Sequence, residues 1–135
     1  MTWRVGVAVA LVVGCAGELE HPERFTDCPP GYVEELFAEA CGGPCHAGAM
    51  PEAGLDLVSP GVADRVVGAM SATEACDGRM LVDPGSDEHL LLDKLGSRPS
   101  CGGRMPFGQT QLPASQIECV RRWIDEAVDS AGGGS

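Results

Sequence analysis

The chain has 135 residues, of which 44% are hydrophobic, and it carries 20 acidic side chains against 9 lysines and arginines. This length gives room for one domain, and the formal charge of −11 is strongly negative. Such a surface argues against binding to nucleic acid and against direct attraction to anionic lipid, because both carry negative charge. It favours a basic or cationic partner, with simple solubility as the alternative explanation.

The N-terminus has the features of an export signal. Arg4 supplies a positive charge, and the apolar run Val5–Val13 is too short to span a bilayer as a helix. The run is followed by Gly14 and Cys15, a pattern similar to a bacterial lipobox, in which small residues precede a cysteine that becomes lipidated. The sequence therefore predicts an extracytoplasmic protein (in the periplasm or at the cell surface) anchored to the membrane by a lipid on Cys15. The alternative is an ordinary signal peptide cut nearby, with Cys15 as a spare thiol.

Export also predicts that the remaining cysteines are oxidised or covalently modified rather than left free. Without Cys15 there are six of them, which allows three disulfides, or two thioethers and two disulfides. The aromatic residues (two Trp, one Tyr and three Phe) are few for a core. Small domains of this kind usually depend on disulfides, a metal or a cofactor. The six cysteines are Cys28, Cys41, Cys45, Cys76, Cys101 and Cys119.

We divide the chain into four segments. Residues 1–14 are the signal peptide, and residues 15–30 are the lipidated cysteine followed by a polar, acidic tether without periodicity. Residues 31–129 form the domain, and residues 130–135 are a glycine-rich, flexible tail. We expect His21, which lies in the tether, to be solvated.

Within the domain, apolar residues recur at helical spacing in four segments, and no run is typical of a strand. The predicted class is therefore all-α, with about three to five short helices and long loops. Ser59 and Ser86 are candidate N-caps, and Gly96 stands where a helix should end. The predicted helices are Tyr32–Cys41, Ser59–Met70, His89–Leu95 and Pro113–Val128.

The stretch Cys41–His46 has the sequence CGGPCH. A cysteine pair followed directly by histidine is typical of covalent haem attachment, in which the thiols form thioethers and the imidazole binds the iron. Here three residues separate the cysteines instead of the usual C-x-x-C-H spacing, and the Gly-Gly-Pro spacer can bulge to absorb the extra residue. The rival interpretations are disulfides at these cysteines and a zinc site, which would lack a fourth ligand.

The order of motifs along the chain resembles the single-haem class of c-type cytochromes. An early helix ends in a cysteine pair and histidine, a Met-Pro pair lies in a late loop, and the closing helix carries Trp-Ile. Two intervening segments are also similar to parts of small exported cytochrome-c-like domains. Within Val33–Val128, the matching segments are Cys41–His46, Gly54–Leu57, Val82–Gly85, Met105–Pro106 and Trp123–Ile124.

The resemblance implies a cytochrome-c-like fold around haem c. Cys41 and Cys45 match the thioether cysteines, and His46 matches the proximal iron ligand. Met105 matches the distal ligand; with both axial positions filled, the chain would be an electron carrier and not an enzyme. The helix that carries Trp123 matches the closing helix, which in the family packs against the first helix near the haem edge.

Other residues compete for some of these roles. His89 is the rival distal ligand, although its place at the polar start of a helix favours a surface residue. Met70 and Met80 are expected to fill the core. Without ligation by Met105 the iron would keep an open position, and a peroxidase-like role would become conceivable.

Position along the chain suggests two disulfides, although the sequence does not determine connectivity. A Cys76–Cys101 bond would close the loop that presents Met105, and would destabilise the unfolded chain by about 3 kcal/mol. A Cys28–Cys119 bond would tie the start of the domain to the last helix.

Together these features predict a monomeric, lipid-anchored c-type cytochrome that transfers single electrons. Its acidic face would dock a more basic redox partner in a weak, salt-sensitive encounter. The alternative is a haem-free, disulfide-stapled lipoprotein that serves as a structural or binding module. In that case Cys41 and Cys45 would themselves lie in disulfides.

Overall fold

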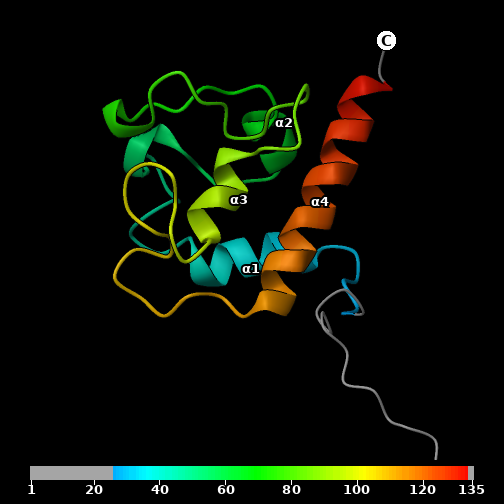
Figure 1. Ribbon diagram of the computed structural model, residues 1–135. Coiled ribbons are helices and arrows are strands. Elements are labelled where there is room, and N and C mark those ends of the chain that lie inside the picture. Colours follow the sequence, from blue (N-terminus) through cyan, green and yellow to red (C-terminus); the bar gives the residue numbers. More distant parts are fainter. Residues whose placement is uncertain (1–25, 134–135) are drawn as a thin grey trace, which may run out of the picture.

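The computed structural model describes residues 26–133, whose helices are shown in Figure 1. The signal peptide, Cys15 and His21 lie outside the described residues. The described part contains helices, two isolated β-bridges and no strand, so the all-α prediction is confirmed. None of its helices is long and apolar enough to cross a membrane. The helices are α1 (Tyr32–Ala40), α2 (Val62–Val66), α3 (Leu90–Leu95) and α4 (Ala114–Gly132), with short 3₁₀ turns at Glu52–Gly54 and Glu74–Cys76.

The longest helix, α4, contacts each of the other α-helices and crosses α1 near the bottom of Figure 1. Apolar residues recur every three or four positions on one face of α4, and Val120 and Ile124 on this face are fully buried. Where α1 meets α4, the rings of Phe37 and Trp123 pack edge to face with their centroids 5.4 Å apart. The predicted packing of the closing helix against the first helix is therefore present.

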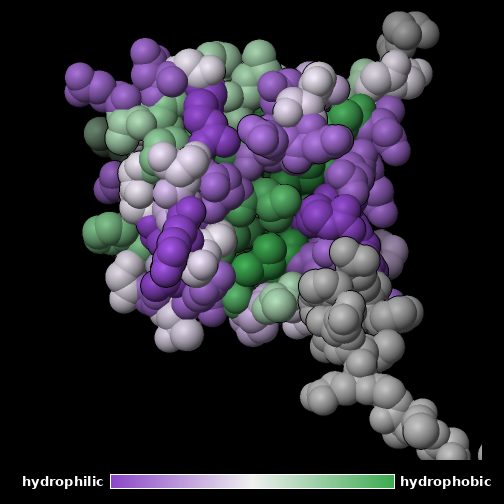
Figure 2. Space-filling view, viewed as in Figure 1, coloured by the Kyte–Doolittle hydropathy of each residue, from purple (hydrophilic) through white to green (hydrophobic). Residues whose placement is uncertain are grey.

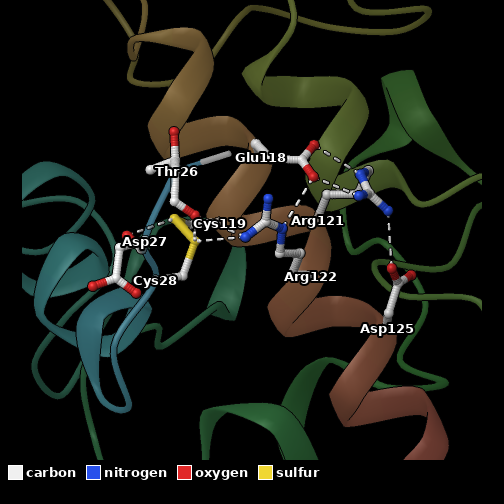
Figure 3. Close-up of polar contacts among 8 residues, drawn as sticks. All are labelled: Thr26, Asp27, Cys28, Glu118, Cys119, Arg121, Arg122 and Asp125. Atoms are coloured by element: carbon white, nitrogen blue, oxygen red, sulfur yellow. Dashed lines mark hydrogen bonds and ion pairs between the residues drawn. A yellow bond between two sulfur atoms is a disulfide. The ribbon is translucent and has the colours of Figure 1, made fainter. Parts of the chain in front are cut away.

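The segment before α1 is tied to α4, as Figure 3 shows. Cys28 forms a disulfide with Cys119, which closes 91 residues of chain. Arg122 donates from Nη1 to the Thr26 carbonyl at 2.8 Å, and Glu118 orients this arginine by accepting from its Nε at 3.1 Å. A cross-link over so long a loop lowers the entropy of the unfolded chain, which stabilises the fold by about 4 to 5 kcal/mol.

The predicted helix Ser59–Met70 is wrong at both ends. The carboxylate of Asp56 accepts the second and third backbone N–H groups after it, both at 2.9 Å, and so turns the chain before any helix forms. Gly61 then adopts a left-handed φ of 81°, and α2 begins only at Val62. The backbone is extended directly after Val66, where it leaves the helix to pair with the segment around residue 82.

The later helices also differ from their predicted bounds. The Ser86 hydroxyl accepts the Glu88 N–H at 3.0 Å, so this serine caps a turn before α3 and not the helix itself. At the other end of the chain α4 continues to Gly132, past the predicted end near Val128 and past the expected start of the tail. Met70, which we expected in the core, lies beyond the end of α2 and is 51% exposed.

Candidate functional site

Helix α1 places the first cysteine of the motif in the interior. Val33 and Phe37 share the buried face of this helix. The Cys41 N–H donates to the Phe37 carbonyl at 2.9 Å, so Cys41 continues the helical geometry for one more residue. Because residues four apart lie on one side of a helix, Cys41 shares the buried face of Phe37 and is itself buried.

The Cys41–His46 stretch forms one wide turn. The His46 N–H donates to the Cys41 carbonyl, five residues earlier, at 2.9 Å. Inside it, the Cys45 N–H donates to the Gly42 carbonyl at 3.0 Å. The bond from His46 to Cys41 is an i→i−5 hydrogen bond. A bond of this kind is typical of a widened helical turn, which holds one residue more than an α-turn. The turn thus accommodates the extra spacer residue and stays closed.

Two glycines make this turn possible. A Cβ atom on Gly42 would lie 2.5 Å from the Ala38 carbonyl oxygen, so a side chain at this position would collide with the backbone of α1. Gly43 has a φ of +54°, in the left-handed region that favours glycine. The spacer is therefore adapted to one particular conformation.

Both cysteines of the motif carry free thiols, whereas the other four cysteines of residues 26–133 form disulfides. Cys41 is buried and Cys45 is half-buried. Burial, together with the neighbouring Cys45 thiol, raises the pKa of Cys41 to about 11. The Cys41 sulfur is therefore protonated at neutral pH, and this form oxidises slowly. The disulfides are Cys28–Cys119 and Cys76–Cys101, the two pairs named from the sequence.

His46 is held by one ring nitrogen. Its Nδ1 lies 3.1 Å from the Leu55 carbonyl oxygen, which can only accept, so Nδ1 carries the ring hydrogen and Nε2 keeps its lone pair. Two backbone hydrogen bonds hold the segment around Leu55 against the motif: Glu52 N–H to Cys45 carbonyl at 2.7 Å, and Leu57 N–H to His46 carbonyl at 2.9 Å. Metal-ligating histidines generally show this arrangement, in which the second nitrogen is bonded to a carbonyl.

His89 has the opposite arrangement. It is 7% exposed, so the prediction of a surface residue is wrong. Its Nδ1 accepts the backbone N–H of Asp83 at 3.1 Å. In the neutral ring the hydrogen therefore lies on Nε2, which leaves that atom no lone pair for a metal. The hydrogen bond to Asp83 closes the turn before α3 and gives His89 a structural role.

The loop that carries Met105 is fastened to α3. A disulfide joins Cys76 to Cys101, and Lys94 of α3 donates from Nζ to the carbonyls of Cys101 at 2.6 Å and Gly103 at 3.1 Å. The Met105 N–H in turn donates to the Lys94 carbonyl at 2.8 Å. The Met105 side chain is half-buried against the hydrophobic core. Its position is therefore fixed by both backbone and side-chain contacts.

Asp93 holds the start of the same loop. Its Oδ2 accepts the Ser100 N–H at 3.0 Å, the Ser100 hydroxyl at 2.7 Å and the Arg79 guanidinium at 3.1 Å. Burial opposes ionisation of Asp93, but the hydrogen bonds from Ser100 and Arg79 outweigh it and lower the pKa of the carboxyl. Sequence reasoning missed Asp93 and Lys94. The available signal was two charged residues inside the leucine-rich α3.

A groove of about 770 Å³ is lined by three parts of the chain: α2, α4, and the segment that leads into α1. It is lined by Trp123, whose Nε1 donates to Glu34 at 2.9 Å, and by Asp64 and Arg122 among others. The cysteines of the motif, His46 and Met105 do not line this groove.

Comparison of the chain with protein-family models, with curated proteins and with solved structures finds no match. Among residues 26–133, no group of three or more His, Cys, Asp or Glu side chains is arranged to hold a metal ion. The zinc interpretation of the motif gains no support from this geometry.

Gly42→Ala should lower the free energy of unfolding by about 2 to 3 kcal/mol, because the new Cβ forces the turn away from α1. Gly43→Ala, the matched control, meets no atom within 4 Å and should cost only the strain of its left-handed φ, about 1 kcal/mol. Urea unfolding of both variants measures the difference. Equal losses at the two positions would show that the turn does not pack closely on α1.

Asp93→Asn should lower the free energy of unfolding by about 2 kcal/mol at neutral pH, because charge-assisted hydrogen bonds are lost. The folded-state pKa is depressed, so the carboxylate stabilises fully above its unfolded pKa of about 3.9 and progressively less as the pH falls through the folded value. Wild-type and variant stabilities should therefore converge in acid. Asp87→Asn, at an exposed site, is the control. A difference between wild type and Asp93→Asn that persists unchanged in acid would contradict this role.

Proposed function

We propose that this protein is a single-haem c-type cytochrome that carries one electron at a time. Cys41 and Cys45 would hold the haem through thioether bonds to its two vinyl groups, and His46 and Met105 would bind the iron. The observation that carries the proposal is two free thiols beside an imidazole whose Nε2 is available. Haem c supplies a ferric/ferrous couple, and two filled axial positions restrict it to electron transfer.

The state of the cysteines supports thioether attachment. In a compartment where thiols are oxidised, the four other cysteines of residues 26–133 are paired, whereas Cys41 and Cys45 are not. The haem-free alternative needs both of them in disulfides. A pair that is used to attach a cofactor would instead stay unpaired until the cofactor arrives.

The arrangement of the two candidate distal ligands supports Met105. Its thioether is a soft ligand that favours ferrous iron, and the loop that carries it is fixed to Lys94 and closed by a disulfide. His89, by contrast, uses its Nδ1 lone pair for the Asp83 N–H. Binding a metal through Nε2 would require the ring hydrogen to move to Nδ1, which would break the hydrogen bond from Asp83.

The surface supports binding of a large apolar group. Figure 2 shows hydrophobic side chains gathered in a hollow in the middle of one face, near α3 and α4. Leu81, Leu92, Met105 and Leu112 are among the half-buried hydrophobic residues that pack against the core. With only six aromatic residues in 135, the chain has few large side chains of its own to cover such a surface. A flat porphyrin would do so.

The charge of the chain supports a basic redox partner. Exposed acidic residues lie on α1 and α4, among them Glu35, Glu39, Asp125 and Asp129. Complementary charge accelerates encounter and weakens with salt, as suits a transient electron-transfer complex. We propose that the domain acts as a monomer and that a lipid on Cys15 anchors it outside the cytoplasm.

The full chain, expressed with its export signal, should be red after purification and should keep its haem under denaturing conditions, because thioether bonds are covalent. Cys41→Ser/Cys45→Ser should lose the haem. Cys76→Ser/Cys101→Ser removes the same number of sulfur atoms outside the motif and should keep it. Visible spectra and haem staining of denaturing gels measure both. A colourless wild-type protein with Cys41 and Cys45 in disulfides would favour the haem-free module.

Met105→Ala should open the distal side of the haem to added cyanide, because the alanine leaves one axial position without a ligand. Met80→Ala, the matched control, removes the same side chain elsewhere and should leave the iron closed. Cyanide titration followed by the visible spectrum measures the effect. If His89→Ala binds cyanide and Met105→Ala does not, the distal ligand is His89.

A further inference from the structure

Arg104 directly precedes Met105 in the loop fastened to α3. Its Nη2 donates to the Gln109 carbonyl at 3.0 Å. Its Nη1 is buried and has no hydrogen-bond partner among residues 26–133. Of the buried side-chain nitrogen and oxygen atoms in this part of the chain, Nη1 of Arg104 alone lacks a partner.

This unpartnered nitrogen belongs to a group that stays charged, because the guanidinium does not lose its proton in proteins. A buried donor of a charged group that finds no acceptor destabilises the fold. Other half-buried arginines meet carboxylates: Arg79 lies 3.1 Å from Asp93, and Arg122 lies 3.1 Å from Glu118. No carboxylate of the described residues forms an ion pair with Arg104. The half-buried Arg104 therefore presents one buried guanidinium nitrogen that still needs an acceptor.

The surrounding loop holds this guanidinium in place. A Cβ atom on Gly103 would lie 3.3 Å from the Phe107 ring, so this ring folds back over the residue before Arg104. On the other side, the Met105 N–H is bonded to Lys94 of α3. The Gln109 carbonyl accepts from Nη2, and the Nη1 arm of the same guanidinium is buried.

Resting on the function proposed above, we propose that Arg104 binds a propionate carboxylate of the haem. An arginine fork matches a carboxylate with two parallel hydrogen bonds, which are among the stronger hydrogen bonds in proteins. Arg104 adjoins the residue that would bind the iron, so one loop would present a thioether to the metal and a guanidinium to the carboxylate. The contact would give Nη1 its missing acceptor and place a fixed positive charge near the haem.

The reduction potential of the haem-loaded, full-length protein tests this contact. A nearby positive charge favours the ferrous form, so Arg104→Gln should lower the ferrous-to-ferric ratio at a fixed potential about tenfold, which is about 59 mV for one electron. Arg98→Gln removes the same charge from an exposed position in the same loop, and solvent should screen its effect. Arg104→Lys keeps the charge without the fork and should give an intermediate potential.

Equal reduction potentials in Arg104→Gln and Arg98→Gln would overturn this role for Arg104. Because both variants would still hold haem, that result would not contradict the proposed function. A colourless wild-type protein would overturn the proposed function, and this contact with it. If Arg104→Gln does not fold, Arg104→Lys decides the matter. A lysine variant with the potential and the urea unfolding midpoint of the wild type would overturn the contact, and a lowered potential would support it.

Discussion

The burial of α1 against α4 is the constraint on which the candidate site depends. Phe37 is 1% exposed, and the Trp123 ring packs on it from α4. Cys41 follows Phe37 by one helical turn, so the packing that buries Phe37 also buries the first thiol of the motif. The Cys28–Cys119 disulfide holds the segment before α1 against α4. These contacts fix the start of the motif, and the loops then orient the other candidate ligands.

The sequence predicts a helix correctly where its apolar residues recur at helical spacing over a long segment and the same residues are buried in the fold. The apolar stripe of α4 recurs over 19 residues, long enough for its period to identify both the helix and its buried face. The five residues of α2 carry too little periodicity to compete with neighbouring polar groups. The Asp56 carboxylate turns the backbone where a Ser-Pro pair predicts a helix start, and the true boundary depends on that hydrogen bond.

Residue type and order identify the candidate ligands, but the state of each histidine depends on backbone groups that come from elsewhere. His46 meets the carbonyl of Leu55, and His89 meets the N–H of Asp83. One contact makes Nδ1 a donor and the other makes it an acceptor, so the two rings present different atoms to a metal. The sequence does not show which ring nitrogen of either histidine carries the hydrogen. The wide turn at the motif is equally hidden, because only the approach of Gly42 to Ala38 shows why the spacer begins with glycine.

The distribution of charge connects the long loops to the acidic exterior. Short helices leave much of this backbone in loops, whose carbonyl groups need donors. Lys94 donates to two of them, and Arg65 donates to the carbonyls of Asp56, Ser59 and Pro60. Arg65 also lies 4.0 Å from the Asp56 carboxylate, so one cation serves both the loop backbone and a carboxylate. With 9 basic residues against 20 acidic ones, the chain still carries a formal charge of −11, and this is the charge that a basic partner would meet.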